Sequence, residues 1–385
     1  MSLALRQDPI GLYLHIPFCE RRCHFCAFFT QGYREERAAA FMTDLLAEIR
    51  IHAEAGSLRG RTIETIYFGG GTPTSLSATQ LIEILDACRC HFTVDRSAEI
   101  SVEANPAGVD EGLLMALSQA GFNRLSFGAQ SLDDRELAAI GSPHGVSDII
   151  RAVETARKVG WRNISLDLIY GLPGQSHERL RGNLDAAIGL EPEHISFYGF
   201  TLEEGTRFAR DAEQGHLNQQ PDGLLAEMYQ TGRDSLQSAG YLQYEVSNFS
   251  RPGYACRHNL GYWTDREWLG LGPSAHWYLK GERASNVESL EEYHRSLAGG
   301  ALPIGEREAA DPDLRLREAF AFGLRKVAGV QLSPLKQRYG VSPRERFSEP
   351  IERLTTGGWV EIKGDWLRPT FAGLALADNL AMAFL

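Results

Sequence analysis

Between residues 11 and 200, short apolar runs alternate with longer segments of helical periodicity, and this alternation constrains the fold more than any other feature. The apolar runs are 11–16, 65–68, 99–103, 124–128, 164–169 and 195–200, and the helical segments between them are 35–55, 78–90, 111–120, 146–159 and 177–190. Strands that alternate with helices predict a parallel sheet with helices packed outside it. Right-handed crossovers allow such a sheet to stay open or to curl into a partial barrel, and the pattern does not separate the two.

Three cysteines follow the first apolar run with the spacing C-x-x-x-C-x-x-C, at Cys19, Cys23 and Cys26. Three thiolates can hold three irons of a [4Fe–4S] cube and leave the fourth iron open for a small molecule. A structural zinc site would need a fourth ligand, and a disulfide would leave one cysteine unpaired. Both alternatives stay open, but the spacing favours the cluster.

Polar residues or glycines follow the apolar runs where the strands should end. Residues 69–74 read Gly-Gly-Gly-Thr-Pro-Thr, Glu103 ends the third run and Asp167 lies in the fifth. Active sites of parallel α/β sheets lie at the carboxyl ends of the strands. Glycines there expose backbone groups to a ligand, and carboxylates accept hydrogen bonds from hydroxyl or ammonium groups. A plain turn and solvated loop carboxylates are the competing interpretations.

The stretch Tyr13-Leu-His-Ile-Pro-Phe-Cys19, with the cysteine spacing, resembles radical S-adenosylmethionine (SAM) proteins of the oxygen-independent coproporphyrinogen III oxidase-like family. The resemblance implies a partial (β/α)6 TIM-like barrel, a [4Fe–4S] cluster and SAM on its open iron. It also implies SAM contacts at Tyr13, Phe25, Gly70, Gly71, Thr72, Glu103, Gln130, Asp167 and Thr201. Ser142 departs from the family, which carries an arginine there near the SAM carboxylate. We therefore expect weaker SAM binding unless another residue substitutes.

A second motif reads His258-Asn259-Leu-Gly-Tyr262-Trp263. A lone histidine is more often an ordinary hydrogen-bonded residue, but imidazole also ligates heme iron and large aromatic rings supply flat apolar area. The segment resembles the HNxxYW motif of the HemW branch of heme chaperones, which coproporphyrinogen dehydrogenases proper lack. The resemblance implies heme binding at these four residues.

Two functions follow from the resemblance. In the first, the protein binds heme and delivers it to respiratory membrane proteins, while SAM and the cluster serve regulation or transfer, with an electron donor for the cluster and with homodimer formation as one route. In the second, it is an oxygen-independent coproporphyrinogen III dehydrogenase that decarboxylates propionate side chains by radical chemistry. The second motif favours the first function. A radical SAM enzyme that acts on another substrate is a third alternative, and enzymatic activity stays open.

The remaining features concern organisation and location. We divide the chain into a radical SAM partial barrel at 1–215, a connector with the heme motif at 216–304, and a C-terminal, mainly helical, winged-helix-like cap at 305–385. The formal charge of −11 argues against a nucleic-acid partner. We see neither an apolar run of membrane-spanning length nor a signal-peptide pattern. We therefore expect a cytoplasmic protein whose contact with the inner membrane, where it occurs, is peripheral.

Overall fold

The computed structural model of the chain describes residues 9–309 and 311–385, and its main feature is one sheet of twelve strands. The six central strands are parallel and pair in the order of the sequence: β1 (Ile10–Ile16), β4 (Thr62–Gly70), β5 (Thr93–Ala104), β6 (Arg124–Gln130), β7 (Ile164–Tyr170) and β8 (His194–Gly199). Each of them contains or overlaps one predicted apolar run. The predicted parallel α/β fold is therefore confirmed.

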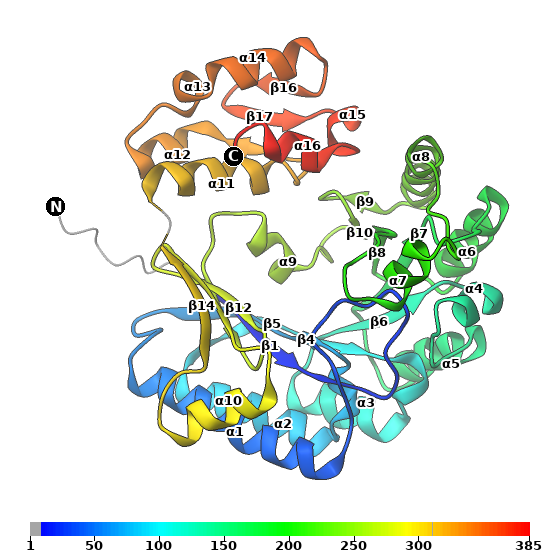
Figure 1. The fold of residues 1–385 in the computed structure, drawn as a ribbon, viewed down its shortest axis with the longest axis vertical. Helices are drawn as coiled ribbons and strands as arrows, with labels where there is room; N and C mark the ends of the chain where they lie inside the picture. Colours follow the sequence, from blue (N-terminus) through cyan, green and yellow to red (C-terminus); the bar gives the residue numbers. More distant parts are fainter. Residues whose placement is uncertain (1–8, 310) are drawn as a thin grey trace.

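The connecting helices cover one face of this sheet. They are α1 (Glu35–Glu54), α2 (Ala78–His91), α3 (Glu111–Ala120), α4 (Asp134–Ala139), α5 (Val146–Lys158) and α6 (His177–Gly189). Local signals set their ends, because Ser77 accepts a hydrogen bond from the backbone of Gln80 and Asp110 accepts one from the backbone of Leu113. Figure 1 shows α1, α2 and α3 on the face of the sheet that points away from α9 (Arg257–Tyr262).

Side chains alternate in character along the central strands. In β4, Ile66 and Phe68 belong to the apolar core, whereas Thr65 and Tyr67 contact polar groups of the other face. The polar residues of this inner face are Tyr13, Thr65, Tyr67, Glu99, Ser101, Glu103, Arg124, Ser126, Ser165, Asp167, His194, Ser196 and Tyr198. Strands of parallel sheets are usually apolar on both faces. The alternation instead gives the partial barrel a polar interior, which we call the lumen.

The second half of the chain extends the same sheet at both edges. On one side β11 (Trp268–Leu271) runs parallel to β1 and is followed by the antiparallel strands β12 (His276–Leu279), β13 (Glu282–Asn286) and β14 (Ile304–Ala309). On the other side β10 (Asn248–Ser250) and β9 (Leu242–Gln243) follow β8. The helices of this half are α7 (Arg207–Glu213), α8 (Asp222–Ser238), α9 and α10 (Leu290–Ala298). The stretch predicted as a connector thus contributes the strands β9 to β13 to the main sheet.

The C-terminal residues form a smaller unit with a core of its own, which includes Phe320, Phe347 and Phe384. Its elements are α11 (Pro312–Gly323), β15 (Val330–Gln331), α12 (Leu332–Tyr339), α13 (Pro343–Arg346), α14 (Ser348–Thr356), β16 (Val360–Lys363), β17 (Trp366–Pro369), α15 (Phe371–Leu374) and α16 (Ala377–Met382). Figure 1 shows this unit beyond α9, on the concave side of the sheet. Arg283 of β13 holds it with two hydrogen bonds to Glu318, at 2.9 and 3.0 Å.

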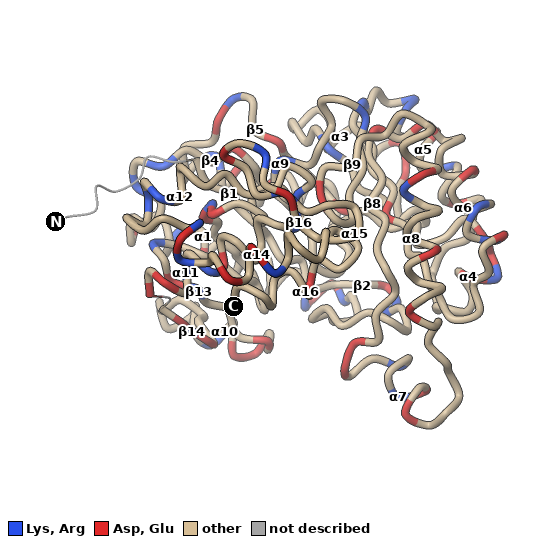
Figure 2. The backbone as a smooth tube through the Cα atoms, turned by 90° about the horizontal axis from the view of Figure 1, so that it is seen from above, with Lys and Arg blue, Asp and Glu red and all other residues tan. Residues whose placement is uncertain are grey.

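Charged residues are spread along the chain. Figure 2 shows acidic and basic residues interspersed, and the segment around α7 standing away from the rest of the molecule in that view. Within 9–309 and 311–385, no helix has both the length and the apolar character needed to cross a membrane.

Candidate functional site

The three cysteines lie on the loop that follows β1. Cys19 ends the short strand β2 (Phe18–Cys19), which pairs with β3 (Gln31–Gly32) and so closes the loop. The backbone N–H of Cys26 donates to the carbonyl of Cys23, and the backbone N–H of His24 donates to the carbonyl of Ile140. All three thiols are half-buried. The loop therefore presents them together at the carboxyl end of the sheet, as the sequence predicts.

The thiols influence one another electrostatically. Burial raises the pKa of each, and burial together with the charges of Cys19 and Cys26 raises the pKa of Cys23 to about 12. Among the described residues, no three His, Cys, Asp or Glu side chains converge as they would around a single metal ion. A [4Fe–4S] cube places each cysteine on a separate iron, so three neighbouring but spread thiols fit it. When bound, such a cluster supplies an electron and one open iron.

The glycine run at the end of β4 packs directly against the cysteine strand. Gly70 has a φ of +110°, which favours glycine. A Cβ atom on Gly71 would lie 2.6 Å from the carbonyl oxygen of Phe18. Thr72 donates its backbone N–H to that same oxygen, and its hydroxyl oxygen lies 3.4 Å from the Cys19 sulfur. The structure thus brings three of the predicted SAM positions beside the cluster loop.

Two half-buried carboxyl groups face the lumen near this end. Tyr67 donates its hydroxyl to Glu103 at 2.7 Å, and burial raises the pKa of Glu103 to about 7. Asp167 accepts hydrogen bonds from Ser126 and Ser165, and burial raises its pKa as well. Neither group is a solvated loop carboxylate. Both are placed to receive hydroxyl or ammonium groups of a ligand.

The other predicted SAM positions surround these groups. Tyr13 lies on β1, with its hydroxyl oxygen 3.1 Å from Nδ1 of His15. Gln130 ends β6 with a φ of +64°, at a break in the strand register. Phe25 is partly buried on the cysteine loop, and Thr201 is exposed beyond β8. All of these positions are thus near the carboxyl ends of strands, with Thr201 the most exposed.

Ser142, where the family pattern has arginine, bonds within its own loop. Its hydroxyl oxygen lies 3.1 Å from Nδ1 of His144 and accepts the backbone N–H of the same residue. Another guanidinium approaches this region, because Nη1 of Arg207 on α7 lies 2.9 Å from Nε2 of His24 on the cluster loop. The cluster loop therefore has a cation beside it that the sequence pattern did not indicate.

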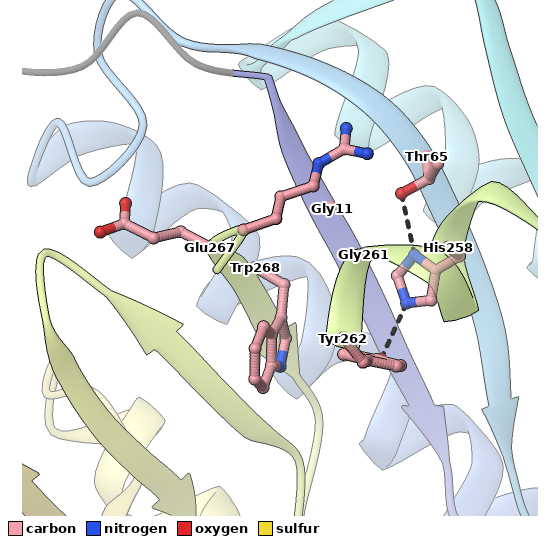
Figure 3. A pocket seen from close by; sticks show the side chains of 8 residues that line it. Gly11, Thr65, His258, Gly261, Tyr262, Glu267 and Trp268 are labelled. Atoms are coloured by element: carbon pink, nitrogen blue, oxygen red, sulfur yellow. Dashed lines mark hydrogen bonds between the residues drawn. The ribbon is translucent and has the colours of Figure 1, made fainter. Parts of the chain in front are cut away.

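The second motif forms α9, which lies inside the concave face of the sheet (Figure 1). His258 is only 3% exposed. Its Nδ1 lies 2.9 Å from the Thr65 hydroxyl and its Nε2 lies 2.8 Å from the Tyr262 hydroxyl, as Figure 3 shows. Its ring stacks on Tyr67 with centroids 5.1 Å apart. Burial, assisted by the charges of Arg266 and Arg124, lowers the pKa of His258 to about 3, so the imidazole is neutral.

Glu99 on β5 anchors the start of α9. Its two carboxylate oxygens accept the backbone N–H groups of Arg257 and His258 at 2.9 and 3.0 Å. The cavity beside His258 has a volume of about 10 Å³, room for roughly one water molecule. In this arrangement the imidazole is enclosed, with both ring nitrogens engaged.

The remaining motif residues point to different neighbours. Asn259 is half-buried on α9. The guanidinium of Arg325 lies 4.9 Å from the centroid of the Trp263 ring, and the indole N–H is buried with no hydrogen-bond partner in the described part of the chain. The motif therefore reaches from the barrel to the C-terminal unit. Along β4, Thr65 and Gly70 are five positions apart, or roughly 16 Å. Tyr67 lies between them, with its ring on His258 and its hydroxyl on Glu103, so the motif lies toward the amino end of the lumen and the cluster loop at its carboxyl end.

Comparisons with known proteins agree with this arrangement. Residues 13–187 match the model of the Radical SAM superfamily, and residues 310–376 match that of the HemN C-terminal domain. The heme chaperone HemW of Mycobacterium tuberculosis is 36% identical over 98% of this chain and 95% of its own. The chain belongs to the HemW family. The HemW protein of Bacillus subtilis is 35% identical over 97% of this chain and 98% of its own.

The fold match extends over the whole molecule. The structure of coproporphyrinogen III oxidase (HemN) from Escherichia coli, described as a radical SAM enzyme, superposes with a TM-score of 0.86 at 25% identity and covers 99% of this chain and 91% of that chain. The predicted resemblance is therefore confirmed. Membership of the HemW family, within the radical SAM superfamily, implies a [4Fe–4S] cluster and SAM.

Sequence reasoning missed several residues of this HemW-family lumen. They are Thr65, Tyr67, Glu99, Ser101, Arg124, Ser126, Ser165, His194 and Ser196. A signal for them exists, because polar residues recur at every second position in segments such as Arg-Leu-Ser at 124–126 and Ser-Leu-Asp at 165–167. Reading these segments only as apolar runs hid the inward-facing half of each strand.

Proposed function

We propose that this protein is a heme chaperone of the HemW type, which binds heme at α9 and carries a SAM-associated [4Fe–4S] cluster at Cys19, Cys23 and Cys26. In this proposal the nine SAM positions line the carboxyl end of the lumen. Delivery of heme to respiratory membrane proteins, an electron donor for the cluster, homodimer formation and a cytoplasmic location with peripheral membrane contact belong to the same proposal. Family membership supports it.

The observation that carries the heme assignment is the environment of His258. A histidine that ligates a metal usually has its other ring nitrogen oriented by a hydrogen bond. The Thr65 hydroxyl supplies such a partner at Nδ1, which leaves Nε2 as the nitrogen for iron. Tyr262 engages Nε2 at 2.8 Å, so heme entry requires Tyr262 to rotate away and α9 to open. In the closed arrangement the imidazole therefore becomes available to heme iron only after Tyr262 has moved.

Heme titration into the anaerobically reconstituted full chain tests this. We expect a Soret shift in the wild type, binding at least tenfold weaker in His258→Ala, and unchanged binding in His91→Ala, which alters an exposed histidine at the end of α2. Thr65→Val should weaken binding by roughly tenfold, as second ligand shells commonly do. Equal affinities of the wild type and His258→Ala would refute the assignment.

The close match to a coproporphyrinogen III oxidase structure favours one second candidate, oxidative decarboxylation of coproporphyrinogen III. An anaerobic assay for protoporphyrinogen distinguishes the two. Heme binding without turnover supports the chaperone, and turnover without heme binding supports the enzyme.

A further inference from the structure

The middle of the lumen contains a buried guanidinium, whose charge also acts on His258 of the heme motif. Arg124 opens β6 and is 1% exposed. Its Nε and Nη1 atoms are buried and, among the described residues, have no hydrogen-bond partner. Ser101, its partner across the β5–β6 pairing, is also buried, and its hydroxyl likewise lacks a hydrogen bond. Two neighbouring strands thus present unused donors to the same space.

Buried guanidinium groups are costly unless an acceptor receives their hydrogen bonds. The nearby carboxylates act on Arg124 through their charge, but the hydrogen bonds that they accept come from other groups. Glu99 accepts two backbone N–H groups of α9, Glu103 accepts the Tyr67 hydroxyl, and Asp167 accepts two serine hydroxyls. The protein therefore places the guanidinium in the lumen without supplying its acceptor. A carboxylate from a ligand is the kind of acceptor that these donors can bind.

The position of Arg124 relative to His258 limits which ligand could supply the carboxylate. His258 stacks on Tyr67, and the strand pairings place Tyr67, Ser101 and Arg124 in one row across β4, β5 and β6. Two strand spacings amount to about 10 Å, which is comparable to the reach from the centre of a porphyrin to an extended side-chain carboxylate. Tyr198, on the lumen side of β8, is 41% exposed.

We propose that Arg124, assisted by Ser101, is a carboxylate-binding site of the lumen that takes a propionate of heme once α9 has opened. This inference rests on the proposed function. The same carboxylate chemistry is present in the methionine part of SAM, and the experiment below separates the two sources.

The test compares heme with heme dimethyl ester, whose propionates carry no charge. We expect the wild-type full chain to bind heme at least tenfold more tightly than the ester, because a charge-assisted bidentate contact is lost. Arg124→Gln should bind both equally, Arg124→Lys should restore part of the preference, and Ser101→Ala should reduce it a few-fold. Equal affinities of the wild type for heme and for the ester would overturn the proposal without any variant.

Titration of SAM into the same proteins completes the design. Unchanged SAM affinity in Arg124→Gln, with loss of the ester preference, supports the propionate. If Arg124→Gln weakens SAM binding but still prefers heme over the ester, the propionate assignment is wrong, and the carboxylate that Arg124 binds is that of SAM. If the wild type binds no heme, the proposed heme-chaperone function is wrong, and so is the assignment of Arg124 to a heme propionate. The SAM titration then decides whether Arg124 binds a carboxylate at all.

Discussion

The two ends of the lumen are built differently. At the carboxyl end, backbone contacts position the ligand-binding groups: Gly71 packs on the Phe18 carbonyl, and Thr72 donates its N–H to the same oxygen. At the amino end, side chains close upon one another, and His258 has both ring nitrogens engaged. The first arrangement leaves three thiols at the surface of a loop, whereas the second encloses its histidine and engages both ring nitrogens. We infer that the carboxyl end is ready for its cofactors and that the amino end must open.

The largest expected effect concerns the cysteines and tests the independence of the two ends. Cys26→Ala should abolish assembly of the [4Fe–4S] cluster, because two thiolates leave a second iron without a protein ligand. The cluster-free protein should unfold at nearly the same temperature as the wild type, since Cys26 is half-buried on a loop held by backbone bonds. Iron and sulfide analysis after reconstitution measures the first effect and thermal unfolding the second.

Cys90→Ala is the matched control, because Cys90 is an exposed thiol on α2. It should retain full iron content. A wild-type iron content in Cys26→Ala would contradict the assignment of the cluster ligands.

The next effect concerns the amino end, where a change of side chain should cost stability. Glu99→Ala removes the acceptor of two α9 backbone N–H groups and leaves Arg124 with less compensating charge. We expect the free energy of unfolding to fall by about 3 kcal/mol, while cluster assembly is retained. Denaturant unfolding of the cluster-free protein measures this loss.

Glu64→Ala serves as the comparison, because Glu64 also reaches the α9 region but through partly exposed ion pairs with Arg257 and Arg266. Such pairs contribute less than about 1 kcal/mol. If Glu99→Ala and Glu64→Ala lost similar amounts of unfolding free energy, Glu99 would stabilise α9 no more than a partly exposed ion pair does.

A third prediction concerns the pH dependence of stability and a buried carboxyl group of α1. Glu48 on α1 is fully buried and accepts hydrogen bonds from Gly272, Asn286 and Tyr293. Burial raises its pKa from 4.5 to about 7. The native state therefore favours the protonated form, and the stability this provides is complete below the unfolded-state pKa and is lost as the pH rises through 7.

The wild type should accordingly lose stability relative to Glu48→Gln between pH 5 and 8, by on the order of 2 kcal/mol. Glu54→Gln, which alters an exposed residue of the same helix, should show no such pH-dependent difference. Chemical unfolding at several pH values measures both. A constant difference between wild type and Glu48→Gln would show that Glu48 titrates normally.

The sequence predicted the first half of the fold closely because its signals are local. The helix predicted at 111–120 matches α3. Asp110 caps its start, because the side chain accepts the backbone N–H of Leu113, three residues further on. The edge strands β13 and β14 were missed, because segments such as Glu-Arg-Ala-Ser-Asn at 282–286 have no strand pattern of their own and are ordered by pairing with a sheet edge.

The site divides in the same way. The placement of Cys19, Gly70 and Glu103 at strand ends was predictable from the order of the apolar runs, and their roles toward the cluster and SAM stay predictions. The partners of His258 were not, because Thr65 and Glu99 precede it by more than 150 residues and only the folded barrel brings them together. The motif predicted a ligand for iron, but nothing local indicated that its imidazole is enclosed.

The smallest predicted effect concerns Ser142. It tests whether another residue supplies the positive charge that the family's arginine would bring to the SAM site. An added arginine would supply a charge-assisted contact to the SAM carboxylate, as the family pattern implies, so Ser142→Arg should bind SAM up to about tenfold more tightly. Arg207 already brings a guanidinium to the cluster loop, 2.9 Å from His24. If Arg207 substitutes for the family arginine, Ser142→Arg should gain little in the wild type and most in Arg207→Ala. SAM titration of the four proteins of this cycle measures the coupling. Equal SAM affinities in all four would mean that neither position contributes charge to the SAM site.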